Sequence, residues 1–371
     1  MIAIAILVFI FILGLLIFVH EFGHFVMAKR AGMRVEEFGF GFPPRMFGIR
    51  RGETIYSINW IPLGGFVKIT GEDGGPNDDP RAFVNKSFWR RFSTLLAGVV
   101  MNFILGWFLL FLGLFLIGTP ADVTDPGALG NGRIRDSKLT IVAVEKDSPA
   151  EYAGFKHGDI ILSVNGQTFV NIDEMIAYTK FHAGSNVVYE IKRGKDIHKL
   201  DITPRVNPPA GSGPVGFAPA YVGKVTYPFA ESLALSFSSF LNKSTAIIVA
   251  FGKLISGLFT SGKLIEGLSG PVGIAVLTRD FTRLGFAYLV QFAAVLSINL
   301  GVINAFPFPA LDGGRALFLI IEKIRGARSI KVERIANTVG FVLLLLLMVV
   351  ITYKDIGKYS EPFKRLFDSI L

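Results

Sequence analysis

The chain has 371 residues, of which 51% are hydrophobic and 35 are phenylalanine, and its mean hydropathy is +0.51. This composition is too apolar for an ordinary soluble enzyme, so most of the chain is expected to lie in a membrane. The net charge of +9 comes with no basic stripe interleaved with aromatic residues, so no nucleic-acid partner is expected. The absence of cysteine excludes disulfides and thiolate ligands, and any bound metal must use histidine, aspartate or glutamate.

Four apolar runs are long enough to cross a hydrocarbon core of ~30 Å at ~1.5 Å per residue. They cover roughly residues 2–27, 92–118, 286–306 and 335–352. The first run has no basic n-region and no small-residue cleavage site, which favours an uncleaved span over a signal peptide. Residues 233–259 are also apolar, but Asn242, Lys243 and Lys253 interrupt them, which favours an interfacial or amphipathic helix.

The distribution of basic residues predicts the orientation of these spans. Residues 29–91 contain 11 Lys/Arg against 7 Asp/Glu, and residues 315–334 contain 6 against 2. Basic connectors stay on the cytoplasmic side, so both are expected there. Residues 119–285 are nearly balanced, with 17 basic and 15 acidic residues, as expected for a domain on the outer side. Both termini are then outside.

Part of the outer region has the pattern of a small soluble domain. Residues 138–206 alternate short β-rich runs with glycine turns and include one helix that opens at Asn171, which predicts an α+β fold. Residues 146–166, KDSPAEYAGFKHGDIILSVNG, resemble the core of a PDZ domain. That resemblance implies binding of an extended peptide by strand addition, and the alternative is a spacer that packs on the membrane part. Surface positions are expected for three scattered histidines, His157, His182 and His198.

The end of the first apolar run carries a metal-ligand pattern, HEFGH at residues 20–24. On a helix, His20 and His24 lie about 40° apart around the axis and ~6 Å apart along it, so both imidazoles can reach one ion. Zn²⁺ binds histidine nitrogens at ~2.0–2.1 Å, and Glu21 on the same turn can deprotonate a water. The alternative is a polar helix end at the lipid headgroups, although ionisable side chains deeper in a bilayer are rare without a function.

A second signal lies in residues 299–315, NLGVINAFPFPALDGGR. Pro307 and Pro309 stop a helix, and the Gly313–Gly314 pair permits a tight turn, so Asp312 is expected on irregular backbone at membrane depth. The first and third spans both run inward, which brings Asp312 to the leaflet of His20 and His24 as a third zinc ligand. The alternative is a helix-end aspartate paired with Arg315.

With these residues the chain resembles the site-2 proteases, which are zinc intramembrane proteases, and in particular their bacterial RseP-type members. HEFGH matches the family's HExxH, and residues 304–313 match its N-x-x-P-x-P-x-L-D-G. The resemblance implies that His20, His24 and Asp312 bind zinc, that Glu21 is catalytic and that Asn304 holds the substrate backbone. It also extends to Asn102 as a substrate contact, although this chain reads AGVVMN where many relatives have a proline after the glycine.

Residues 61–69, IPLGGFVKI, resemble the family's membrane-dipping β-hairpin on the cytoplasmic side. An apolar strand with an unpaired edge near the site would hold an unwound substrate. This assigns substrate binding to Leu63, Gly64, Gly65, Phe66 and Val67; the alternative is an interfacial turn. RseP-type enzymes often carry tandem PDZ domains, whereas this chain has room for one.

The sequence thus predicts a multi-pass α-helical membrane protein of about four spans, with a membrane β-hairpin and one inserted PDZ-like domain. The expected parts are residues 1–118 and 286–371 as two halves of a protease core, 119–206 as the PDZ-like domain and 207–285 as an interfacial connector. The expected function is zinc-dependent cleavage of single-span substrates in the cytoplasmic (inner) membrane, such as anti-sigma factors or remnant signal peptides. The alternatives are a non-catalytic membrane adaptor and a metal transporter, which would need more intramembrane ligands.

Overall fold

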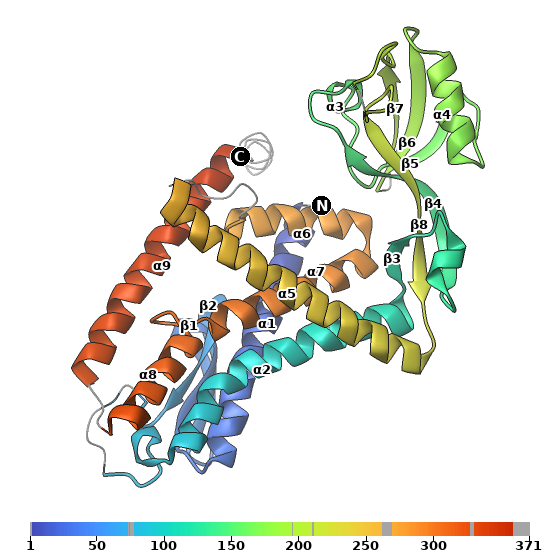
Figure 1. Ribbon diagram of the computed structural model, residues 1–371. Helices are drawn as coiled ribbons and strands as arrows, with labels where there is room; N and C mark the ends of the chain where they lie inside the picture. The colour runs from blue at the N-terminus through green and yellow to red at the C-terminus, as the bar shows by residue number, and fades with distance from the viewer. Residues whose placement is uncertain are drawn as a thin grey trace. The chain divides into compact units, whose positions relative to one another are not determined.

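The structure is a computed structural model that describes residues 2–72, 74, 78–194, 196–209, 211–261, 269–326 and 330–358 (Figure 1). It forms two compact units. The first, called the membrane unit below, comprises Met1–Leu110, Ser236–Thr282 and Leu289–Leu371. The second comprises Phe111–Leu235 and Arg283–Tyr288 and contains the inserted domain.

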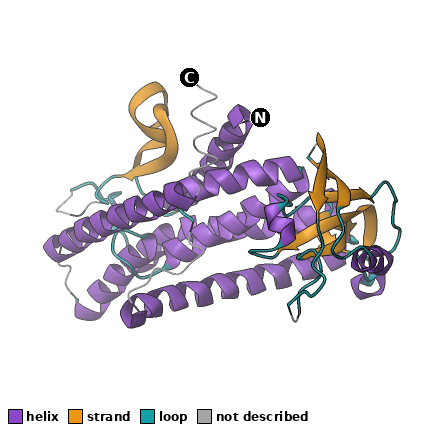
Figure 2. Cartoon of the chain, turned by 90° about the horizontal axis from the view of Figure 1, so that it is seen from above, coloured by secondary structure: helices purple, strands orange, loops and turns teal. Residues whose placement is uncertain are grey.

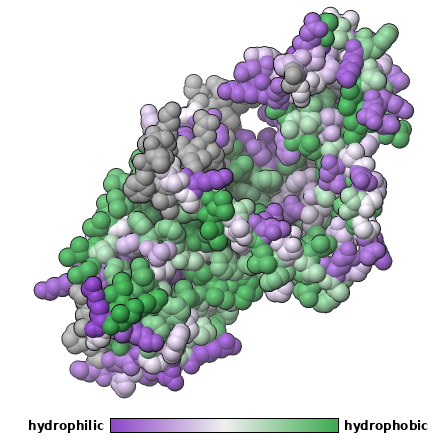
Figure 3. All heavy atoms as spheres, in the orientation of Figure 1, coloured by the Kyte–Doolittle hydropathy of each residue, from purple (hydrophilic) through white to green (hydrophobic). Residues whose placement is uncertain are grey.

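Long apolar helices make up most of the membrane unit. Four of them coincide with the predicted spans: α1 (Ile2–Arg30), α2 (Phe88–Leu112), α7 (Phe286–Ala305) and α9 (Ile330–Lys358). Large hydrophobic side chains on these helices are exposed, and they form a broad hydrophobic surface over the helices in Figure 3. Such a surface is unfavourable in water and suits contact with lipid, so the structure agrees with the predicted membrane protein.

A fifth helix is longer than the sequence analysis expected. Residues 233–259, read as an interfacial segment, lie within one continuous helix, α5 (Phe229–Ser261). Its Phe229–Leu254 part is long and apolar enough to cross a membrane, which brings the candidate spans in the described chain to five. The interrupting polar residues do not break the helix, because asparagine and lysine are tolerated in helices and only their burial in lipid is costly.

Small residues allow the helices of the membrane unit to approach closely. A Cβ on Gly23 of α1 would lie 2.5 Å from the carbonyl oxygen of Ala97 in α2. Similarly, a Cβ on Gly106 of α2 would lie 2.6 Å from Ile298 of α7. Close backbone contact at small residues is the usual way in which membrane helices associate, because lipid removes most of the hydrophobic driving force between them.

Two long, bent strands form the sheet of the membrane unit, β1 (Val35–Arg51) and β2 (Thr54–Ile69). The first part of β1 lies between two segments of β2, because Phe38 is opposite Val67 on one side and opposite Tyr56 on the other. Residues 61–69, predicted to be a hairpin, are therefore the final segment of one strand. Among the described residues this segment pairs only with β1, so its other edge is unpaired.

The inserted domain is an α+β fold, as predicted. Its six-stranded sheet has the order β3-β8-β4-β5-β6-β7 and is separate from the β1–β2 sheet (Figure 2). The strands are β3 (Thr119–Asp122), β4 (Arg133–Val144), β5 (Ile160–Val164), β6 (Val187–Arg193), β7 (Asp196–Ile202) and β8 (Phe217–Thr226). Ile141, Val164, Met175 and Tyr189 lie in its core, beside the helices α3 (Pro149–Tyr152) and α4 (Ile172–Phe181).

The sheet of this domain starts at Thr119, as expected, but extends beyond residue 206, where the predicted domain ends. The sheet continues to Thr226, because β8 pairs with both β3 and β4. The extra strand follows a stretch rich in proline and glycine, which conceals the strand pattern from sequence reasoning. Within the domain, Asn171 caps α4 as predicted, and its side chain accepts a hydrogen bond from the backbone of Asp173.

Two shorter helices complete the membrane unit, α6 (Pro271–Leu284) and α8 (Asp312–Arg325). A bidentate ion pair joins α8 to α2, with Arg91 2.7 and 2.8 Å from the two carboxylate oxygens of Glu322. At the other end of the unit, Asp355 of α9 is buried and accepts hydrogen bonds of 2.8 Å from the backbone of Gly270 and Gly273. Asp355 thus satisfies free N–H groups at the start of α6.

Candidate metal centre and active site

The two histidines of HEFGH lie near the end of α1 and face the same way. Their Nε2 atoms are 3.2 Å apart, and the rings meet nearly edge to face with centroids 4.8 Å apart. The four-residue spacing on a helix places the imidazoles one above the other, as the sequence predicts. His20 is buried and His24 is nearly so.

Helix α2 contacts the Nδ1 atoms of both imidazole rings. The backbone carbonyl of Thr94 is 2.8 Å from Nδ1 of His24, and the side-chain amide of Asn102 is 3.0 Å from Nδ1 of His20. Gly98 lies between these two positions, where a Cβ would be 2.4 Å from Nε2 of His24 and 2.7 Å from Cε1 of His20. Thr94, Gly98 and Asn102 therefore form one face of α2, at i, i+4 and i+8, that is shaped to the two imidazoles.

The contact with Thr94 fixes which nitrogen of the His24 ring is free. A carbonyl can only accept, so Nδ1 of His24 carries the proton and Nε2 keeps its lone pair. For His20 the same state requires the Asn102 oxygen to face the ring, and the assignment of amide oxygen and nitrogen rests on the hydrogen-bond network. That assignment also gives a partner to the Asn102 Oδ1 atom, which is buried without one in the present orientation. Both Nε2 atoms then face the same point as electron-pair donors.

Asp312 is the first residue of α8 and completes the group. Its Oδ2 atom lies 3.0 Å from Nε2 of His20 and 3.3 Å from Nε2 of His24. Helix α7 ends at Ala305, as the prolines predict, and the start of α8 packs closely against the backbone of residues 305–308. A Cβ on Gly313 or Gly314 would lie 2.2 Å or less from the backbone oxygens of Ala305 and Phe308, respectively, so only glycine fits at either position.

The alternative partner for Asp312 is engaged elsewhere. Arg315 is 2.7 Å from Glu72, just after β2, and this ion pair takes the place of the predicted helix-end pair. Asp312 consequently faces the histidines, with its Oδ2 atom buried and without a hydrogen-bond donor. A buried carboxylate oxygen in such a place requires a cation.

The spacing of the three donor atoms suits a metal ion. Tetrahedral zinc with ligands at ~2.0–2.1 Å places neighbouring ligand atoms about 3.3 Å apart. The three separations observed here are 3.0, 3.2 and 3.3 Å. In the described part of the chain, these three residues form the group of histidines and carboxylates with metal-binding geometry. Three protein ligands leave a fourth position open, which is typical of catalytic rather than structural sites.

Two of the predicted catalytic and substrate-binding residues lie on helices that lead to this group, Glu21 on α1 and Asn304 on α7. Glu21 is half-buried, and its side chain passes β2, where a Cβ on Gly65 would lie 3.2 Å from Glu21 Cγ. Asn304 is half-buried on the last turn of α7, and its amide makes no hydrogen bond within the described residues. Its contact with the substrate backbone stays a prediction.

Other predicted substrate-binding positions have varied surroundings. Gly64 has φ +103°, Phe66 packs against Gly39 of β1, and Val67 lines a cavity described below; the side chain of Leu63 lies outside the described residues. Asn102 is fully buried against His20. The structure thus gives Asn102 a histidine as its neighbour, whereas the sequence predicts a substrate contact.

Sequence reasoning did not single out Thr94 or Gly98, although a signal was present. Thr94, Gly98 and Asn102 recur every four residues in a span that otherwise consists mostly of large apolar side chains. The ion pair between Arg315 and Glu72 was also missed, because 243 positions separate its partners in the chain.

Comparison with known proteins agrees with this geometry. The model of "Peptidase family M50" matches residues 8–347. The chain belongs to peptidase family M50. This confirms the predicted resemblance, since the site-2 proteases belong to that family.

Curated relatives of this M50 protein match over nearly their whole length. The protein is 30% identical to "Zinc metalloprotease RasP" of Geobacillus kaustophilus, with 96% of this chain and 98% of the relative covered. It is also 30% identical to "Regulator of sigma-W protease RasP" of Bacillus subtilis, with 95% and 98% covered. Among solved structures, the PDZ domain of an SdrC-like protein from Listeria monocytogenes matches at 23% identity with a TM-score of 0.21, covering 24% of this chain and 92% of that one.

Proposed function

We propose that this M50 protein is a zinc-dependent endopeptidase that cleaves membrane-embedded segments of single-span proteins. The observation that carries the proposal is the convergence of His20, His24 and Asp312 beside Glu21, at the junction of apolar helices. The names of the relatives as zinc metalloproteases support the choice of metal. Zinc, when bound, supplies Lewis-acid polarisation of the scissile carbonyl and lowers the pKa of water.

The chain's own residues perform the remaining steps. Glu21 accepts a proton from the attacking water and then donates it to the amine that leaves as the peptide bond breaks. Thr94 and Asn102 hold the histidine rings so that both Nε2 atoms face the ion. Asn304 offers its amide to the substrate backbone, and the edge of β2 beside Glu21, unpaired within the described residues, pairs with an extended stretch of substrate.

A helical substrate must unwind before this can happen, because its carbonyls are engaged within the helix. The open edge of β2 supplies replacement hydrogen bonds for the unwound stretch, which reduces the cost of exposing peptide groups in a membrane. We therefore expect preferred substrates to carry helix-breaking residues near the cut. The resemblance to RseP-type proteases suggests anti-sigma factors and remnant signal peptides as substrate classes, and one relative is named as a regulator of sigma-W.

The position of Asp312 bears on the orientation. Because His20 and His24 near the end of α1 and Asp312 just after α7 face the same point, α1 and α7 run in the same direction, and the chain between α2 and α7 begins and ends on the same side of the membrane. On the basis of the basic connectors, that side is the outer face of the cytoplasmic membrane, with both termini outside and the active site toward the cytoplasm. In this orientation α5 does not add a separate membrane crossing to the other four, although it is long enough to span the membrane.

The inserted domain offers a site for an extended peptide. Residues 222–225 of β8 pair with β3, and the Tyr221 backbone bonds to Val123 and Thr124, so within the described residues this edge of β8 is open over residues 217–220. A cavity of about 270 Å³ lies there, lined by Phe217 and Pro219 of β8 and by Ile176 and Thr179 of α4. We assign this groove to recognition of an extended chain end, on the substrate or on another protein.

The test of the proposed function is the Glu21→Gln variant. It keeps the three ligands and removes the proton acceptor, so it should retain about one zinc per chain and lose cleavage of a single-span reporter. Glu174→Gln, at an exposed position on α4, is the matched control and should cleave normally. Equal processing of the reporter by wild type and Glu21→Gln would refute the catalytic proposal and favour a peptide-binding adaptor.

A further inference from the structure

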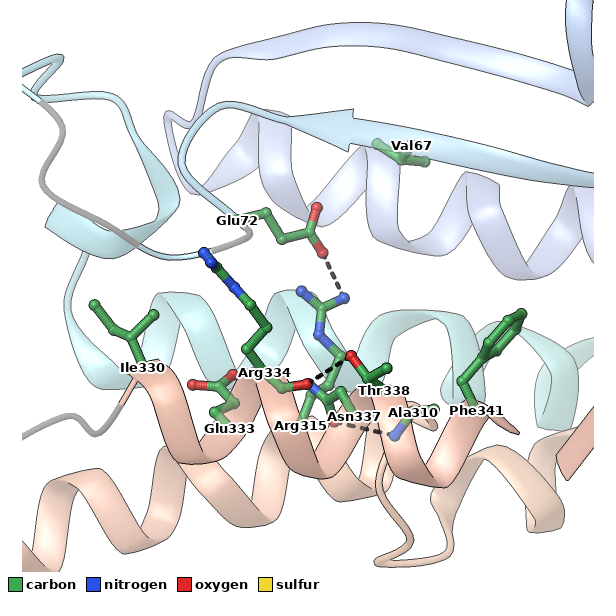
Figure 4. A pocket seen from close by; sticks show the side chains of 10 residues that line it. All are labelled: Val67, Glu72, Ala310, Arg315, Ile330, Glu333, Arg334, Asn337, Thr338 and Phe341. Atoms are coloured by element: carbon green, nitrogen blue, oxygen red, sulfur yellow. Dashed lines mark hydrogen bonds and ion pairs between the residues drawn. The ribbon is translucent and has the colours of Figure 1, made fainter. Parts of the chain in front are cut away.

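A large cavity with a charged lining lies next to the metal group. It has a volume of about 670 Å³ and is bounded by β2, by the loop and first turn around Asp312, and by the start of α9 (Figure 4). Val67 lies on the β2 side and Ala310 and Arg315 on the α8 side. None of the metal group's three residues lines it, so the cavity adjoins the metal site without containing it.

One wall of the cavity is a face of α9 that differs from the rest of that helix. Glu333, Arg334, Asn337 and Thr338 are polar or charged and line the cavity, whereas the next turns from Phe341 onward are almost entirely apolar. A polar face at the start of a membrane helix is costly against lipid and favourable against water or a polar chain. This wall therefore suits a polar occupant.

Two contacts connect the walls of the cavity to the segment that carries Asp312. The Asn337 side chain accepts a hydrogen bond of 3.1 Å from the backbone of Ala310, two residues before Asp312 and itself at φ +73°. Across the cavity, Arg315 of the first turn of α8 holds Glu72 at 2.7 Å. Both contacts are drawn in Figure 4. The hydrogen bond holds α9 next to the segment before Asp312, and the ion pair holds the end of β2 next to the first turn of α8.

The strand geometry leads directly from the catalytic glutamate into this space. Gly65 packs against Glu21, and Val67, two residues further along the same strand, lines the cavity. At ~3.3 Å per residue, the cavity begins about 7 Å from the point opposite Glu21. A peptide paired with the open edge of β2, with its reacting bond near Glu21, would place its next two to five residues in the cavity.

We propose that this cavity is a substrate subsite that receives the extended, polar segment on the cytoplasmic side of the scissile bond. The inference rests on the proposed function and adds a substrate class, namely spans whose unwound end is followed directly by polar residues. Arg315 and Glu72 neutralise each other, and Glu333 and Arg334 add one charge of each sign. The lining therefore selects polar over apolar side chains and has no strong preference for either sign of charge.

The absence of cysteine in the chain makes a crosslinking test possible without background. A single-span reporter is used whose cleavage by wild-type protein has been shown and whose cut site has been mapped. Single cysteines are placed along the reporter and captured by Glu21→Gln protein that carries Thr338→Cys in the cavity wall. The matched control is Val339→Cys, an exposed neighbour on α9 that faces a different, apolar surface.

The proposal predicts disulfides with Thr338→Cys only for reporter cysteines about two to five residues to the cytoplasmic side of the cut, a register set by the strand rise. The crosslinking yield with Val339→Cys should be lower by a factor of about ten or more, because a defined site is specific for its occupant. A third variant, Val67→Cys on β2, reports binding at the strand itself. Crosslinks at Val67→Cys without any at Thr338→Cys would show that the substrate leaves by another route, and would overturn the proposal.

A second measurement tests whether substrate, rather than lipid or water, occupies the cavity during the reaction. Thr338→Leu adds apolar volume to the wall and should lower kcat/KM about tenfold for the reporter with a polar flank, with zinc content unchanged. With leucines at the flanking positions, the same reporter should have a lower kcat/KM with wild type. The ratio of kcat/KM between the polar and the leucine reporter should be smaller for Thr338→Leu than for wild type. If Thr338→Leu affects both reporters equally, or neither, the cavity does not read the substrate. If no single-span reporter that wild type cleaves can be found in the first place, that result counts against the proposed function.

Discussion

Replacing Gly98 by alanine tests the metal centre most directly. The new Cβ would lie 2.4 Å from Nε2 of His24 and 2.8 Å from Nε2 of His20, both predicted ligand atoms. Ordinary contact requires about 1 Å more than the shorter distance, whereas zinc–ligand distances tolerate only about 0.2 Å. At least one imidazole must therefore leave its position. We expect zinc affinity to fall more than about 100-fold, equivalent to about 2.7 kcal/mol or more.

The assay is competition for zinc between purified protein in detergent and a chelator of known affinity, with metal content measured by elemental analysis. Substitution with Co²⁺ gives an optical signature of the ligand geometry as a second readout. Thermal unfolding without metal should show little loss of stability, because alanine favours a helix by about 1 kcal/mol over glycine. This gain offsets part of the strain.

Gly252→Ala in α5 is the matched control, because a Cβ there meets no atom within 4 Å. It should bind zinc like wild type and be equally or slightly more stable. Wild-type zinc affinity in Gly98→Ala would refute the packing of α2 against the two histidines and, with it, the proposed role of α2 in orienting the ligands.

Three further changes test one contact at the centre and two elsewhere in the membrane unit. Asn102→Ala should weaken zinc binding about 10- to 100-fold, while Asn102→Asp, which keeps an acceptor for His20, should retain more affinity in the same competition assay. Arg91→Leu removes the ion pair with Glu322 and should cost about 3–5 kcal/mol in unfolding experiments, most of it recovered when Glu322→Leu is added. Asp355→Ala frees two backbone donors at α6 and should cost about 1–3 kcal/mol, with Asp355→Asn milder; no loss would show that this cap is dispensable.

The chemistry of the centre could be predicted from the sequence because it depends on local rules. A four-residue spacing on a helix fixes the relative position of His20 and His24 whatever surrounds them. The two prolines before Asp312 likewise stop a helix through covalent geometry alone. Four of the five long helices followed from hydropathy, and the fifth was underestimated because its polar residues were weighed as interruptions.

Only the tertiary structure showed what surrounds the three ligands. The match of Thr94, Gly98 and Asn102 to the imidazoles depends on how α2 packs against α1, which involves residues more than 60 positions apart. The pairing of Arg315 with Glu72, and the cavity it borders, likewise depend on contacts between β2, α8 and α9. The identity of a side chain and its place on a helix are properties of a short stretch of chain. The space left between elements is a property of their packing, and no local pattern encodes it.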